Sequence, residues 1–177
     1  MIEIAIDGTS ASGKGTLAKK LSEKYAIPHL DTGLMYRKVA SEILKNTDYN
    51  NLLELSCQIA KISSFENLQN EELRTENIAQ MASKIAVFPA LRNMLNLKQK
   101  EFVYKSNEQF GGCVLDGRDI GTKILPNANF KFFIDASIEI RAKRRLLEKN
   151  ISFLHENDEK CMLQSLTEKM VVRDNID

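Results

Sequence analysis

The stretch Gly8-Thr9-Ser10-Ala11-Ser12-Gly13-Lys14-Gly15-Thr16 decides the fold of this chain. It follows a β-branched run at residues 2–6, which predicts a buried strand. It precedes Leu17, Leu21 and Tyr25, whose spacing is typical of one face of a helix. A glycine-rich loop between a strand and a helix is the context of a phosphate-binding loop, in which backbone N–H groups and the helix N-terminus hold phosphate oxygens. The loop therefore predicts a nucleoside triphosphate with Mg²⁺, and places Lys14 at the β- and γ-phosphates.

The loop departs from the general pattern at one position. Gly15 follows the lysine, so the hydroxyl group comes one residue later, at Thr16. This Gly-Lys-Gly-Thr order resembles the loop of nucleoside monophosphate kinases. The alternative is a glycine-rich surface turn with a solvated lysine, and the flanking strand and helix favour the phosphate loop.

Composition excludes several classes of protein. With 177 residues, 43% of them hydrophobic, the chain is neither a membrane protein nor fully disordered. Its 25 basic and 24 acidic residues leave a net charge of +1, so no overall field attracts nucleic acid or a membrane surface. Three separated cysteines without a CxxC pair indicate reduced thiols, and residues 1–7 lack the pattern of a signal peptide. We therefore expect a cytoplasmic protein.

Strands alternate with helices along the chain. Short strands are predicted at residues 29–31, 113–115 and 130–134, in addition to the first, with helices between them. This order predicts an α/β fold, a three-layer αβα arrangement around a parallel sheet. Residues 46–74 are rich in Asn, Glu, Ser and Gln, which indicates the edge of a small insert. Helices are predicted after Thr75, a candidate N-cap, and from Pro89.

Polar side chains follow the ends of the predicted strands, where open α/β sheets bind ligands. Arg37 lies one turn inside the helix after the second strand, and Arg118 follows the third strand. Arg173 lies near the end of the chain. Each arginine alone is more often a solvated surface charge. Together beside a phosphate loop, they suit a second, monophosphate anion, because guanidinium groups bind phosphate in a bidentate way.

These motifs together resemble the bacterial cytidylate (CMP) kinase family over nearly the whole chain. The resemblance rests on residues 6–16, 30–37 and 115–122, and on Arg74-Thr75, Ala82-Ser83, Phe88-Pro89 and Arg92. It implies a single P-loop kinase domain over residues 1–177, with a monophosphate-binding insert at about 46–105 and a short lid at about 150–160. It also implies a monomeric, ATP-dependent nucleoside monophosphate kinase that transfers the γ-phosphoryl group of ATP to CMP or dCMP.

The resemblance also implies roles for individual residues. The catalytic residues would be Lys14, Arg37 and Arg118, and the ATP-binding residues would be those of the loop, Gly8 to Thr16. Thr16 and Asp116 would hold Mg²⁺, the latter through water. The CMP-binding residues would be Thr32, Tyr36, Arg37, Ser83, Arg92, Gly117, Arg118, Asp119, Arg173 and Asp177, with Ser83, Arg92 and Asp119 facing the cytosine ring.

Several alternatives remain open from the residues alone. Asp116 either holds the turn at the strand end or contacts Mg²⁺ through water. The basic helix with Arg141, Lys143, Arg144 and Arg145 is either a solvated face or supplies an arginine to ATP. His29 and His155 have no partner spacing and receive no role. The rival functions are a P-loop kinase for another small acceptor, such as shikimate or dephospho-coenzyme A, and a nucleotide-binding module without catalysis.

The resemblance carries one further expectation about the C-terminus. In the family, the sequence of Arg173 to Asp177 continues to another arginine, a strand and a helix, whereas the given sequence stops at Asp177. A sheet without an edge strand exposes unpaired backbone groups and apolar surface. We therefore expect a 177-residue form to be less stable and much less active than a form extended through that arginine, strand and helix.

Overall fold

Four parallel strands form the sheet of the computed structural model, which describes residues 1–45, 50–65, 68, 71–148 and 156–174. Their order across the sheet is β2 (His29–Asp31), β3 (Gly112–Gly117), β1 (Ile2–Gly8) and β4 (Phe130–Ile134). Because all strands run the same way, their carboxyl ends meet at one edge. The phosphate loop and the Asp-Gly-Arg-Asp motif both begin at that edge.

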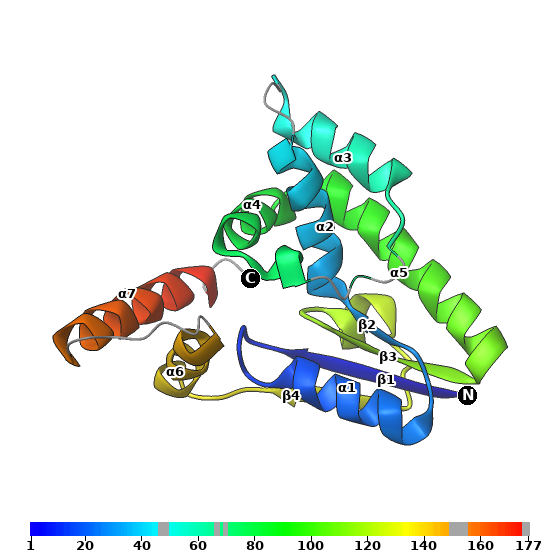
Figure 1. The fold of residues 1–177 in the computed structure, drawn as a ribbon. Coiled ribbons are helices and arrows are strands. Elements are labelled where there is room, and N and C mark those ends of the chain that lie inside the picture. The colour runs from blue at the N-terminus through cyan, green and yellow to red at the C-terminus, as the bar shows by residue number, and fades with distance from the viewer. Residues whose placement is uncertain (46–49, 66–67, 69–70, 149–155, 175–177) are drawn as a thin grey trace.

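Helices cover both faces of the sheet (Figure 1). Helix α1 (Lys14–Tyr25) buries Ala18 on one face against Ile4, Ile6 and Val114. The other face carries the larger core, built mainly by α2 (Thr32–Lys45), α4 (Glu76–Ala86) and α5 (Pro89–Phe110). This arrangement confirms the predicted three-layer α/β fold with a parallel sheet.

The segment after α2 contains a helix that the sequence did not predict, α3 (Leu52–Ile62). Asn51 caps it by accepting a hydrogen bond from the Glu54 backbone N–H at 3.2 Å. A short helical turn, η1 (Glu71–Arg74), precedes α4, and Thr75 occupies the N-cap position of α4 without a side-chain hydrogen bond. Helix α5 runs without a break past residue 105, the proposed end of the insert.

The C-terminal part of the described chain consists of two helices that pack on each other. Helix α6 (Ile138–Glu148) buries Ala142 and Leu146 against Leu166 and Met170 of α7 (Glu156–Asp174). Most of the proposed lid lies outside the described residues, and residues 156–160 form the start of α7. Within the described residues, no helix has the length and apolar character that crossing a membrane requires.

Some side chains lie differently from what the sequence pattern suggests. Leu17 and Leu21 pack against the core, but Tyr25, which the same spacing places beside them, is 45% exposed. Helix α1 ends at Tyr25, and Ala26 takes a left-handed conformation with φ 52°, so the chain turns away there. Strand β4 forms as predicted, but four of its five residues are exposed, so it contributes little to the core.

Candidate functional site

The phosphate loop connects β1 to α1 in a conformation that suits an anion. Ala11 and Gly13 have positive φ values of 58° and 101°, and left-handed residues of this kind turn successive N–H groups toward one side. Gly13 occupies the N-cap position of α1, where it has no side chain to bond to the first N–H groups of the helix. Lys14 donates from Nζ to the Thr9 carbonyl oxygen at 3.4 Å, which keeps its charge beside the loop.

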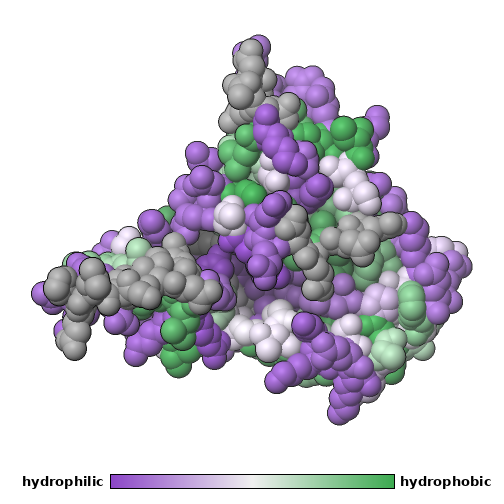
Figure 2. Space-filling view, viewed as in Figure 1, coloured by the Kyte–Doolittle hydropathy of each residue, from purple (hydrophilic) through white to green (hydrophobic). Residues whose placement is uncertain are grey.

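A cavity of about 1010 Å³ opens beside this loop. A recess in this face of the molecule is surrounded by hydrophilic side chains (Figure 2). The cavity brings together most of the residues that the sequence assigned to the two nucleotides. From the loop it is lined by Ser10, Ala11, Gly13, Lys14, Gly15 and Thr16, and from the acceptor group by Thr32, Tyr36, Arg37, Ser83, Arg92, Gly117, Arg118 and Asp119. Asp116 also lines it.

The remaining predicted site residues do not line this cavity or cannot be placed. Gly8, Thr9 and Ser12 belong to the loop but do not line the cavity. Arg173 lies in α7, and its side chain is outside the described part of the structure. Asp177 is also outside the described residues. Their predicted contacts with the acceptor nucleotide stay predictions.

Two arginines reach the acceptor side of the cavity from different elements. Arg37 of α2 donates from Nη1 to the carbonyl oxygen of Leu73 at 2.9 Å. Arg118, which follows β3, donates to the carbonyl oxygen of Gly8 at the end of β1. Arg118 is therefore held at the start of the phosphate loop, and Arg37 is held by the turn η1 of the segment before α4. Two guanidinium groups placed in this way can bind a phosphate dianion.

The groups predicted to read a base come to the cavity from α4 (Ser83), α5 (Arg92) and the segment after β3 (Asp119). Burial raises the pKa of Tyr36, and the neighbouring Arg92 opposes this by lowering it. Ser83 donates to the Ala79 carbonyl of its own helix at 3.0 Å, and Asp119 pairs with Lys123 at 2.8 Å. Hydroxyl and carboxylate oxygens each accept more than one hydrogen bond, so both groups can still accept hydrogen bonds from a base.

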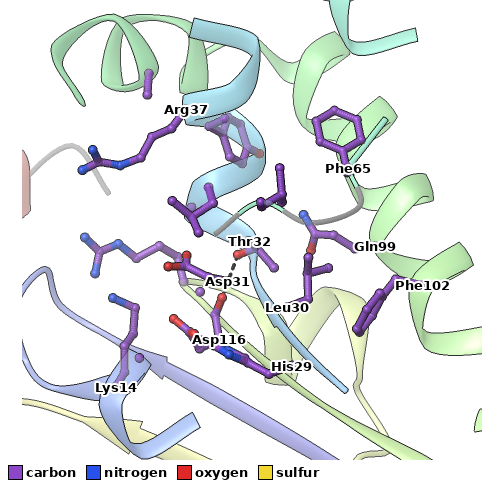
Figure 3. Close-up of a pocket in the computed structure, with 18 of the residues that line it drawn as sticks. Lys14, His29, Leu30, Asp31, Thr32, Arg37, Phe65, Gln99, Phe102 and Asp116 are labelled. Atoms are coloured by element: carbon purple, nitrogen blue, oxygen red, sulfur yellow. Dashed lines mark hydrogen bonds and ion pairs between the residues drawn. The ribbon is translucent and has the colours of Figure 1, made fainter. Parts of the chain in front are cut away.

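His29 lines the cavity, although its position in the sequence predicts no role for it. Its Nε2 donates to Asp116 Oδ2 at 2.7 Å, and the Asp116 side chain is only 2% exposed. Thr32 holds the same residue by donating from Oγ1 to the Asp116 carbonyl oxygen at 2.9 Å. Figure 3 shows His29 and Asp116 beneath Asp31, with Lys14 facing them from the phosphate loop. The pairing of β2 with β3 brings His29 to Asp116, and only the strand order reveals that proximity.

Asp7 is a second residue that the sequence did not assign. Its two carboxylate oxygens accept hydrogen bonds from the backbone N–H groups of Ile120 and Gly121, at 2.8 and 2.9 Å. These residues begin the turn η2 (Ile120–Ile124), which directly follows Asp119. Asp7 therefore ties the end of β1 to the segment that carries Arg118 and Asp119. A carboxylate that accepts two backbone N–H groups is well suited to fix such a turn.

The ionised form of the Asp31 side chain is disfavoured by its surroundings. Burial and the neighbouring carboxylate of Asp116 both raise its pKa, and Arg74, 3.9 Å away, opposes this only in part. A raised pKa means that the folded protein keeps the Asp31 proton to a higher pH than the unfolded chain does. Ionised Asp31 therefore destabilises the folded state increasingly as the pH rises.

We expect Asp31→Asn to raise the melting temperature at pH 7 to 8, with a gain that shrinks as the pH falls and Asp31 itself becomes neutral. Thermal unfolding from pH 8 down to about pH 4, near the ordinary carboxyl pKa of 3.8, measures the effect. Glu42→Gln is the matched control with the opposite sign, because hydrogen bonds from Lys38 and Lys45 lower the pKa of Glu42. A lower melting temperature for Asp31→Asn at every pH would show that its charge is not destabilising.

Known proteins resemble this chain in sequence. The family model for Cytidylate kinase matches residues 4–177. A cytidylate kinase of Bartonella quintana (strain Toulouse) is 47% identical over 145 residues, which cover 82% of this chain and 66% of that protein. One of Methylocella silvestris is 43% identical over 145 residues, with 82% and 65% coverage. The solved structure of an uncharacterized protein from Eubacterium ventriosum aligns with a TM-score of 0.48 at 21% identity, over 97% of this chain and 75% of that one.

The match to the family model extends over both halves of the cavity, from the phosphate loop to Asp119 and beyond. The chain spans about two thirds of the length of the relatives named above. The predicted family is thus confirmed by the model match and by relatives above 40% identity. This chain belongs to the cytidylate kinase family.

Proposed function

We propose that this protein transfers the γ-phosphoryl group of ATP to CMP or dCMP. One observation carries the proposal: a single cavity is lined both by the phosphate loop and by two arginines and a set of groups suited to a pyrimidine base. A phosphate loop alone would support any nucleotide-binding protein. The acceptor residues on the same cavity wall are what favour a kinase with a small nucleotide acceptor.

On the donor side, the loop residues 8–16 hold the phosphates of ATP, and Lys14 reaches the β- and γ-phosphates. The residues present also fit Mg²⁺. Thr16 lies exposed in the first turn of α1, and Asp116 Oδ2 lies 4.0 Å from the position that a Cβ on Gly15 would occupy. A hydroxyl and a carboxylate beside nucleotide phosphates are the donors that Mg²⁺ uses in such sites. Bound there, the ion would neutralise charge on the β- and γ-phosphates.

On the acceptor side, Arg37 and Arg118 hold the phosphate of CMP and orient one of its oxygens toward the γ-phosphorus. Phosphoryl transfer depends mainly on positioning and on charge neutralisation, and these two arginines and Lys14 supply both from this chain. No general base is needed, because the acceptor phosphate is already ionised near neutral pH. Thr32, Tyr36 and Gly117 complete the pocket around the acceptor, and Arg173 and Asp177 stay predicted contacts of the same nucleotide.

Base selectivity follows from the polarity of Ser83, Arg92 and Asp119, which line the cavity. Cytosine carries an N4 amine that donates beside an N3 atom that accepts. Ser83 and Asp119 can accept from the amine, while Arg92 can donate to the ring. Uracil carries an oxygen in place of the amine, which would leave the Asp119 carboxylate facing an acceptor. Buried polar groups left unpaired in this way discriminate strongly between substrates.

We expect Asp119→Ala and Ser83→Ala to raise the KM for CMP by about ten-fold or more, with little change in the KM for ATP. Both substitutions remove hydrogen-bond acceptors from the base and leave the phosphate loop intact. Steady-state kinetics with each nucleotide varied in turn measures the split. Thr122→Ala is the control, because its hydroxyl only donates to the Asp119 backbone carbonyl, at 3.2 Å. An equal rise in both KM values would contradict the division into donor and acceptor sides.

Incubation with ATP and a panel of nucleoside monophosphates tests the proposal itself. We expect CDP and dCDP as the favoured products. Formation of a different product would assign another acceptor to the cavity, and ATP binding without turnover would favour a nucleotide-binding module. The cytoplasmic location and the monomeric state stay predictions from the sequence.

A further inference from the structure

Helix α6 contacts the outer side of the phosphate loop through two arginines. Arg144 donates from Nη1 to the carbonyl oxygens of Ser12, at 2.8 Å, and Ala11, at 3.2 Å. Arg141 donates from Nη1 to the carbonyl oxygen of Ser10 at 3.4 Å. Three consecutive carbonyl groups of the loop therefore face guanidinium groups of one helix.

The direction of these carbonyls sets the direction of the N–H groups that bind phosphate. In a trans peptide, the C=O of one residue and the N–H of the next point to opposite sides. Because Arg144 holds the Ser12 carbonyl on the α6 side, the N–H of Gly13 points away from α6, into the loop. Arg141 acts in the same way on the N–H of Ala11 through the carbonyl of Ser10. The two arginines thus contact the loop on its carbonyl side, opposite the N–H groups that would bind phosphate.

Arg141 is itself fixed in place, whereas Arg144 is exposed. The Arg141 side chain is 6% exposed, donates from Nε to the Ala136 carbonyl at 2.9 Å, and pairs with Asp174 of α7 at 2.6 Å. Its removal would leave the partly buried carboxylate of Asp174 without this partner and would disturb the packing of α6 on α7. Arg144 makes its two contacts from the helix surface, so it can be replaced without opening the core.

We propose that Arg144 is a positioning residue for the phosphate loop: by holding the Ser12 carbonyl, it pre-orients the Gly13 N–H for the phosphates of the donor nucleotide. The inference rests on the proposed function, because it takes ATP as the ligand of the loop. Arg144 acts here through the backbone, before the nucleotide binds. A loop that is already oriented loses less conformational freedom on binding, so the contact increases affinity.

Binding measurements on the full chain test this role. We expect Arg144→Met to lower the affinity for ATP about ten-fold, as measured by calorimetry. The affinity for inorganic tripolyphosphate should fall by the same factor, because both ligands bind to the loop. Arg144→Lys keeps the charge, but a single ammonium group replaces the planar guanidinium that contacts two carbonyls. Its affinity for ATP should therefore lie between those of Arg144→Met and the wild type. Lys143→Met is the matched control: it removes an exposed charge from the same helix and should bind both ligands like wild type. A lower affinity for ATP with an unchanged affinity for tripolyphosphate would overturn the proposal, because Arg144 would then contact the nucleoside.

The state of the loop without nucleotide separates positioning from direct contact with phosphate. In amide NMR spectra of the ligand-free protein, we expect Arg144→Met to shift the Gly13 N–H resonance and speed its hydrogen exchange, with Lys143→Met leaving both unchanged. An unchanged Gly13 amide in Arg144→Met would overturn the proposal, even if ATP binding were weaker. Failure of the wild-type protein to bind ATP would instead contradict the proposed function. The two failures are therefore distinguishable.

Discussion

Replacing Lys14 with methionine is expected to reduce the turnover of CMP by about a hundred- to a thousand-fold while the fold stays intact. Lys14 is the cation that the loop places beside the β- and γ-phosphates, and methionine keeps much of its volume without the charge. Methionine also keeps an unbranched aliphatic side chain in the same place, so we expect the variant to fold although the hydrogen bond from Nζ to the Thr9 carbonyl oxygen is lost.

Turnover with saturating ATP and CMP, together with a thermal melt of the same sample, measures both parts of this prediction. Lys24→Met is the matched control, since Lys24 lies at the far end of the same helix, outside the cavity lining. It should keep normal turnover. Near-normal turnover in Lys14→Met would mean that the loop does not hold the transferred phosphoryl group.

Gly8→Ala is expected to destabilise the fold by about 3 kcal/mol or more. Gly8 ends β1 with φ 155°, and a Cβ there would lie 2.0 Å from the carbonyl oxygen of Ile134. That oxygen belongs to the backbone of β4, so the clash can be relieved only by separating the two strands at the start of the phosphate loop. Arg118 also donates to the Gly8 carbonyl, so the acceptor side would be displaced as well.

Chemical denaturation measures the loss of stability, and Gly15→Ala is the control within the same loop. A Cβ on Gly15 meets only Asp116 Oδ2, at 4.0 Å, which is ordinary van der Waals contact. We therefore expect Gly15→Ala to keep nearly the full free energy of unfolding. Equal stability of the two variants would show that the close approach of β1 to β4 at Gly8 is not rigid.

Much of the fold and of the cavity follows from local sequence patterns. The strand, loop and helix around Lys14 are contiguous in the chain, so their spacing alone predicts them. The acceptor residues were predicted because each lies at a strand end or in a motif of the family, and parallel strands bring those ends together. Arg37, Arg92 and Arg118 line the same cavity as Lys14, and their roles stay predictions.

The features that the sequence did not predict depend on contacts between distant residues. His29 meets Asp116 across 87 positions of the chain, and Asp7 holds the turn after Asp119 across more than 110. Arg144 reaches Ser12 across 132 positions, so the basic pattern of α6 alone could not distinguish a solvated face from this contact. Helix α3 was missed for a different reason, because its apolar residues lie within a polar segment whose composition resembles a loop.

The central claim is that one cavity holds the two nucleotides with their phosphates end to end. A compound that joins adenosine and cytidine through a pentaphosphate bridge tests it most directly, because it can occupy both sides only if they face each other. We expect one molecule to bind per chain, at least about ten-fold more tightly than ATP, and to exclude both ATP and CMP. Affinity no greater than that of ATP, with CMP still bound at saturation, would contradict the shared cavity and with it the proposed transfer.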